Sequence, residues 1–158
     1  VVIGGGALKA APGPLADALI PAIIGGEAII AFAYAEPQGR YDLANIRTSA
    51  RADGGGFVLN GHKAVVYAAP WATHLLVTAR TGGDVRERAG VELFLIEANL
   101  TGITRRDYAT VDGSRASEVY FENVACARDA HLPGGIALVE RIVDEATIGA
   151  CAEGVGAI

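Results

Sequence analysis

The sequence has no methionine, only two cysteines and no apolar run long enough to cross a membrane. A membrane-spanning helix needs about 18 or more apolar residues in a row, so we expect no membrane partner. Cys126 and Cys151 are too few for a disulfide framework and do not form a C-x-x-C pair, which favours a reducing, cytoplasmic location. The first residues, Val-Val-Ile-Gly, carry no basic flank and do not suit a signal peptide. We interpret the chain as a fragment of a longer protein.

Basic residues are also scarce relative to acidic ones. Lys and Arg number 13 and Asp and Glu 18, which gives a formal net charge of −5. This balance provides no basic surface of the kind that binds nucleic acid. A length of 158 residues with 51% hydrophobic and 20% charged residues excludes disorder and suits one folded domain.

Two stretches form the candidate ligand site. The first, Ala28–Asp42, is an apolar and aromatic run that stops at a Glu-Pro pair and continues into a polar loop with glycine and tyrosine. The second, Leu59–Ala69, opens with Asn60-Gly61, a strong signal for a tight turn, and continues as a β-branched run. A strand that delivers its last residues into such a loop can hold a ligand against the rigid edge of a sheet.

Short β-prone runs separated by turn signals fill the middle of the chain. The predicted strands are Ala28–Tyr34, Ile46–Arg51, Gly56–Leu59, Lys63–Tyr67, His74–Ala79, Val91–Glu97, Ile103–Tyr108 and Ser117–Glu122. Short strands at this spacing predict a mainly β fold, either a sandwich or a partly open barrel.

The N-terminal segment is predicted to hold a connector and a helix. Gly4-Gly5-Gly6 is similar to a dinucleotide-binding loop, but the spacing fails and two prolines follow where the phosphate-binding helix should begin. We therefore expect a connector between helices there. Leu15–Ile24 has helical spacing and a stop at Gly25-Gly26, and Pro21 is expected to kink or shorten the helix.

The C-terminal segment returns to a helical pattern after Pro133. Apolar residues recur every three or four positions and small residues dominate the end, which predicts the start of a helical bundle. The expected organisation is therefore a helical part over 1–26, a β-domain over 27–130 and a second helical part over 131–158.

Other chemistries lack the residues that they need. His62, His74 and His131 have no acidic or thiol companion at ligand spacing in the sequence, so we predict no metal site. No Gly-x-Ser-x-Gly elbow is present, and no Ser or Cys pairs with a His in the pattern of a nucleophile. Trp71 is interpreted as an anchor between a loop and the core.

Four ordered segments carry a resemblance to a known family. They read Gly26-Glu27, then Ala35-Glu36-Pro37 followed by Gly39-Arg40-Tyr41-Asp42, then Asn60-Gly61-His62-Lys63-Ala64-Val65-Val66-Tyr67, and finally Val119-Tyr120-Phe121-Glu122-Asn123-Val124. Their order and spacing resemble the middle β-domain of the acyl-CoA dehydrogenases, FAD-dependent enzymes of fatty acid metabolism. In that family, a helical part precedes this domain and a four-helix part follows it.

The resemblance implies which residues contact the cofactor and the substrate. Family members bond the flavin ring edge at the end of the first strand, hold pyrophosphate and substrate in the next loop, and place an aromatic residue and a Thr beside the flavin. The matching cofactor positions are Tyr34, Ala35, Glu36, Tyr41, Val65 and Tyr67, and the matching substrate positions are Tyr41, Asp144 and Thr147. No catalytic residue is implied here, because the family's catalytic Glu lies on a helix beyond Ile158.

Several of these positions depart from the family pattern. Ala35 has no hydroxyl, Val65 cannot stack on a ring, Tyr67 is far larger than Thr, and Thr147 aligns with an Arg. Two hypotheses follow: a subunit that takes part in α,β-desaturation of an acyl-CoA, and a degenerate structural subunit, similar to the small subunits of pimeloyl-CoA-type dehydrogenases. A binding module unrelated to flavin is a third reading. The first hypothesis implies an acyl-CoA substrate, an electron-acceptor protein and a homo- or hetero-oligomer as partners.

Overall fold

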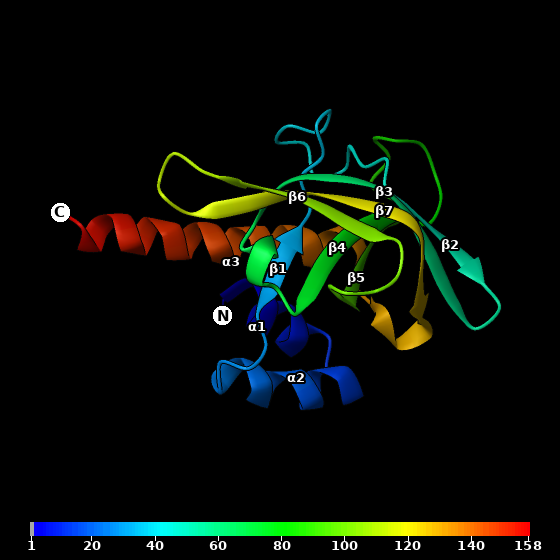
Figure 1. The fold of residues 1–158 in the computed structure, drawn as a ribbon, viewed down its shortest axis with the longest axis horizontal. Helices are drawn as coiled ribbons and strands as arrows, with labels where there is room; N and C mark the ends of the chain where they lie inside the picture. The colour runs from blue at the N-terminus through cyan, green and yellow to red at the C-terminus, as the bar shows by residue number, and fades with distance from the viewer. Residues whose placement is uncertain (1) are drawn as a thin grey trace.

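A single open sheet with helices on one side makes up the fold. The computed structural model describes residues 2–158, in which eight strands form one sheet in the order β6-β7-β3-β2-β4-β5-β8, with β1 paired to β4 off this path. The prediction of a mainly β fold is confirmed, and the sheet does not close into a barrel. In Figure 1, α1 and α2 lie below the sheet, and the C-terminal half of α3 projects beyond it.

The strands agree with most of the predicted runs. They are β1 (Ile30–Ala33), β2 (Ser49–Asp53), β3 (Gly56–Tyr67), β4 (His74–Arg80), β5 (Val91–Glu97), β6 (Ile103–Ala109), β7 (Arg115–Ala127) and β8 (His131–Leu132). β1 runs parallel to β4, whereas β3 and β6 are antiparallel to β7. Two 3₁₀ turns, Ala69–Trp71 and Arg128–Ala130, follow β3 and β7.

The predicted tight turn at Asn60-Gly61 is wrong. Both residues lie inside β3, which joins two predicted strands into one 12-residue strand, and the register shifts by one residue between Leu59 and Gly61. A Cβ at Gly61 would lie 2.4 Å from Thr48 Oγ1. The glycine is therefore needed where the backbone of β3 approaches a neighbouring chain segment closely, and not for a reversal of the chain.

The prediction of a connector around Gly4-Gly5-Gly6 is also wrong. Val2–Ala10 forms a helix, α1, and its glycines allow close packing. A Cβ at Gly4 would lie 2.9 Å from the Cβ of Ile30, and one at Gly6 would lie 2.8 Å from Glu145 on α3. Close packing against β1 and α3 outweighs the low helix propensity of glycine. The glycine run therefore serves helix packing.

The remaining helices are α2 (Pro14–Ile24) and α3 (Gly135–Gly156). Pro21 does not shorten α2, because the helix continues through it to Ile24, and the alternative expectation of a kink stays a prediction. The predicted stop at Gly25-Gly26 is confirmed, since the Gly25 N–H bonds to Pro21 O at 2.9 Å and Gly26 has a φ of 77°.

The core has two parts, one on each face of the central strands. One part contains Leu76 and Leu93 and packs against the helices, through Val139 and Ile142 of α3 among others. The other lies on the opposite face and contains Leu75 and Phe94. Because successive side chains of a strand point to opposite faces, β4 and β5 are apolar on both sides. These two strands hold the layers together.

Within residues 2–158, no helix is both long enough and apolar enough to cross a membrane. Cys126 and Cys151 are free thiols.

Candidate functional site

The two stretches that the sequence singles out meet in the structure. The segment after β1, which contains Tyr34, Ala35 and Glu36, lies alongside the second half of β3. The Ala64 N–H donates to Ala35 O at 2.9 Å, and the side chain of Lys63 reaches back to the same segment. Both Glu36 and Lys63 are named by the motifs, but nothing in the sequence pairs them.

A buried ion pair joins the two segments. Lys63 Nζ lies 2.7 Å from Glu36 Oε1, and the two side chains are 0% and 2% exposed. Nζ also donates to Thr78 Oγ1 at 2.9 Å and to Tyr34 O at 3.3 Å. Lys63 therefore uses its three donors on one carboxylate, one hydroxyl and one carbonyl. A single side chain on β3 thus fixes β4 and the segment after β1.

The Glu36 carboxylate is fully engaged on its own side as well. Its Oε2 accepts the Arg47 N–H at 2.8 Å and the Gln38 side-chain amide at 2.7 Å, and Oε1 accepts the Thr48 N–H at 3.0 Å. The polar segment between β1 and β2 is therefore wrapped around this carboxylate. The prediction that Glu36 contacts a cofactor rests on its backbone, because its side chain faces inward.

Burial and pairing shift both pKa values of the ion pair. Burial alone would raise the pKa of Glu36, but the charge and hydrogen bond of Lys63, with the neighbouring N–H donors, outweigh it and lower that pKa to about 2. Burial lowers the pKa of Lys63 to about 8, against the opposing charge of Glu36. Both groups are ionised at neutral pH, which a buried pair requires if neither charge is to stand alone.

The end of β3 is irregular. The register with β7 shifts between Lys63 and Val66, and Val65 takes a φ of 52°. This left-handed conformation is unusual for a β-branched residue, and the bulge turns the side chain outward. Val65 and Tyr67 are 45% and 56% exposed.

An exposed apolar and aromatic wall results at this end of the sheet. We define the wall as Tyr34, Val65 and Tyr67; Trp71 lies in the 3₁₀ turn that follows β3. Tyr34 is 39% exposed, and its ring stacks on Phe32 with centroids 4.8 Å apart. Trp71 is 55% exposed, so the prediction that it anchors a loop to the core is wrong. A large planar ligand would find apolar contact here.

The other predicted residues lie on other elements of the fold. Tyr41 is fully exposed in the loop between β1 and β2. Asp144 and Thr147 lie on exposed positions of α3, where the Thr147 hydroxyl donates to Val143 O of its own helix at 2.8 Å. No hydrogen bond or ion pair among residues 2–158 joins Tyr41 to either of them. Their assignment to the substrate stays a prediction.

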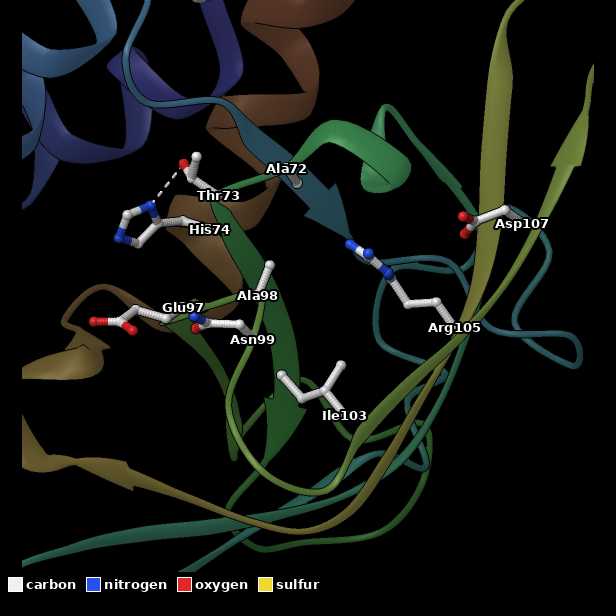
Figure 2. Close-up of a pocket in the computed structure, with 9 residues that line it drawn as sticks. All are labelled: Ala72, Thr73, His74, Glu97, Ala98, Asn99, Ile103, Arg105 and Asp107. Carbon is white, nitrogen blue, oxygen red and sulfur yellow. Dashed lines mark hydrogen bonds between the residues drawn. The ribbon is translucent and has the colours of Figure 1, made fainter.

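Two hollows bear on the search for a ligand site. The larger, about 730 Å³, is shown in Figure 2 and is lined by residues from the start of β4, the end of β5 and β6. It contains none of the predicted site residues, and its charges are mixed, with Arg105 and His74 beside Glu97 and Asp107. The smaller hollow, of about 380 Å³, lies beside the segment after β1 and includes Glu36 in its lining.

The sequence reasoning included Lys63 in a motif but missed its role as the buried partner of Glu36. Its signal was present, because a lysine stands next to the apolar run Ala64–Val66 inside a predicted strand. A lysine is almost never fully buried unless it is paired. Its partner, 27 positions away in the sequence, could not be chosen among the 18 acidic residues without the fold.

Solved structures first define the class of fold. The chain superposes on the glutaryl-coenzyme A dehydrogenase of a glutaryl-CoA complex with a TM-score of 0.91 at 24% identity, covering 99% of this chain and 41% of that one. It also matches a chain of the ChsE4-ChsE5 complex from Mycobacterium tuberculosis with a TM-score of 0.81 at 23% identity, covering 89% and 38%. This chain thus has the fold of a part of each of these two proteins.

Sequence comparison then gives the family. The family model described as "Acyl-CoA dehydrogenase, middle domain" matches residues 31–124, more than half of the chain. Acyl-CoA dehydrogenase FadE29 of Mycobacterium tuberculosis is 29% identical over 104 residues, covering 66% of this chain and 27% of that protein. The mitochondrial long-chain specific acyl-CoA dehydrogenase of Sus scrofa is 32% identical over 117 residues, covering 72% and 27%. The chain belongs to the acyl-CoA dehydrogenase family, and it spans about a quarter of the length of these relatives.

FAD is the cofactor that this family implies, and the wall fits part of it. The exposed faces of Val65 and Tyr67 suit a planar ring, and the Ala35 N–H has no hydrogen-bond partner among the described residues, so it can donate to a ring edge. The Ala35 carbonyl is already used by Ala64. The fit therefore depends on apolar contact and one backbone donor, without the hydroxyl and the aromatic ring that the family pattern has at Ala35 and Val65.

Proposed function

We propose that this chain contributes one wall of the flavin and substrate pocket in an FAD-dependent acyl-CoA dehydrogenase that desaturates the α,β bond of an acyl-CoA thioester. The observation that carries the proposal is the convergence of two strand ends, through Glu36 and Lys63, onto the exposed wall of Tyr34, Val65 and Tyr67. When bound, FAD would accept the hydride that leaves the substrate.

The chain's own residues would bind and orient the ring. Tyr67 and Val65 would cover one side of it, and the Ala35 N–H would bond its edge. The buried pair sets the spacing between these elements, because Lys63 binds Tyr34 O and Glu36 together. We assign no catalytic base to this stretch, so the α proton would be removed by a group outside it. The proposed partners are an acyl-CoA, an electron-acceptor protein and further subunits.

The test is the visible spectrum of the intact protein. A flavin band that bleaches on anaerobic addition of an acyl-CoA supports the proposal. Absence of flavin from the protein purified alone and in complex with a partner subunit would refute it.

A substitution at the wall sharpens this test. Val65→Trp adds a ring where the family pattern has one, and stacking of about 0.5–1.5 kcal/mol should tighten FAD binding about 2- to 10-fold. Val111→Trp is the matched control, because Val111 is fully exposed in the turn between β6 and β7. Equal FAD affinity of the two variants would show that position 65 does not contact the flavin ring.

A second function, a structural subunit without flavin, is favoured by two observations. Val65 presents no ring, and the hydroxyl of Thr147 is turned back onto its own helix. The ChsE4-ChsE5 complex among the structural matches is named for two different components, which is the arrangement that this alternative needs. A colourless chain that assembles with a flavin-containing partner would establish it, and a flavin band in the isolated chain would exclude it.

A further inference from the structure

A row of three side chains crosses the sheet next to the wall. Tyr67 of β3 pairs with Ala116 of β7, and Ala116 pairs with Tyr108 of β6. Residues in register on adjacent strands share a face of the sheet, so both tyrosines flank the small Ala116, which is fully buried. Tyr108 therefore belongs to the surface that begins at the wall.

The next residue on that face of β7 is Glu118, which is held at both oxygens. The Tyr108 hydroxyl donates to Oε1 at 3.0 Å, and His62 Nε2 lies against Oε2. The His62 ring stacks on Tyr120, with centroids 4.3 Å apart and planes within 9° of each other. The Glu118 side chain is only 22% exposed. Its carboxylate is thus fixed in orientation by two elements.

This network reaches the irregular end of β3. Burial and the hydrogen bond to Glu118 raise the pKa of Tyr108. Val65, the left-handed residue of the bulge, lies two residues before Tyr67, which shares this face of the sheet with Tyr108. A hydrogen bond therefore joins Glu118 to Tyr108, and strand register places Tyr108 on the same face as Tyr67 of the wall.

We propose that Glu118 is a positioning residue of the flavin-facing wall: it holds Tyr108, which flanks Ala116 together with Tyr67, and its negative charge lies on β7 diagonally across from Tyr67. Diagonal neighbours on a sheet face are about 7–8 Å apart, a distance at which a partly buried charge still acts. A negative charge there opposes the gain of electrons by a flavin. This inference rests on the proposed function.

The test compares charge removal at two positions of β7 in the intact, flavin-loaded protein. Glu118→Gln keeps the shape and removes the charge, and the midpoint potential of the flavin should become more positive. Glu122→Gln is the control, since Glu122 is exposed on the same strand and makes no side-chain hydrogen bond within residues 2–158. Equal potentials of Glu118→Gln and wild type would overturn the inference while leaving the proposed function in place.

A second pair of variants decides the matter if Glu118→Gln does not fold. Tyr108→Phe removes the hydroxyl that bonds Glu118, and FAD should bind about 5-fold more weakly, as expected for one lost hydrogen bond. Tyr120→Phe removes a hydroxyl that bonds no described residue and should bind FAD like wild type. Equal affinity of the two variants overturns the inference, and a colourless wild-type protein refutes both it and the proposed function.

Discussion

Replacing Lys63 by Met removes the buried cation and retains a side chain of similar length. The Glu36 carboxylate is then left 2% exposed without its counter-charge. Thr78 Oγ1 and Tyr34 O lose a donor at the same time. We expect the meeting of β3 with the segment after β1 to loosen in this variant.

The structure sets the size of this effect. Removal of one partner of a buried ion pair costs about 3–5 kcal/mol. Glu36 keeps three donors, from Gln38, Arg47 and Thr48, at 2.7–3.0 Å, which places the expected loss near the lower end, at about 3 kcal/mol. In the double variant Lys63→Met with Glu36→Gln, neither position carries a buried charge, and we expect a loss of about 1 kcal/mol or less.

Amide hydrogen exchange of β3 is the assay, because it reports the local stability of one strand within the intact protein. Lys9→Met is the matched control, since Lys9 is the other lysine of the chain and is exposed on α1. A loss below about 1 kcal/mol in Lys63→Met, or a double variant as unstable as the single one, would show that the pair does not hold the two segments together.

Three further predictions concern pH, a buried arginine and backbone strain. The pKa of Glu36 is lowered from 4.5 to about 2, so its contribution to stability is complete above pH 4.5 and is lost as pH falls toward 2. When amide hydrogen exchange of β3 is measured across this pH range, the wild type should lose about 3 kcal/mol of stability, and Glu36→Gln should not. The Arg80 side chain donates to six backbone carbonyls within Ala44–Ile46 and Gly82–Ala89, an arrangement that we call the Arg80 clamp. Arg80→Lys cannot supply all of these donors and should lower the free energy of unfolding by about 2–4 kcal/mol. Faster tryptic cleavage at Arg86 and Arg88 would show this loss, and unchanged cleavage would count against the clamp. Val65→Gly relieves the strain of a φ of 52° and should raise the free energy of unfolding by about 1 kcal/mol. A lower melting temperature of this variant would mean that the valine side chain stabilises the fold by more than its backbone strain destabilises it.

Most strands could be predicted because their residues repeat a local pattern. The predicted Val91–Glu97 coincides with β5, and Ile103–Tyr108 differs from β6 by one residue. The wrong predictions lie where contacts between residues that are distant in sequence determine the local structure. Asn60-Gly61 has turn chemistry, yet Thr48 occupies the space beside Gly61 and the strand continues.

The candidate site was partly within reach of the sequence. The motifs located Tyr34–Glu36 and Val65–Tyr67, and the structure brings these stretches together. The inward turn of Glu36 toward Lys63, and the bonds of Glu118 to Tyr108 and His62, depend on strand register. Strand register is set by the whole sheet and cannot be read from any single position of the sequence.

The clamp around Arg80 has a consequence for how this domain can change over time. All six of its acceptors are backbone carbonyls, a group that every amino acid carries. The loops before β2 and after β4 can therefore exchange their side chains freely while one arginine preserves their path. This corner of the domain is a suitable place to graft new recognition residues, provided that the arginine itself is left untouched.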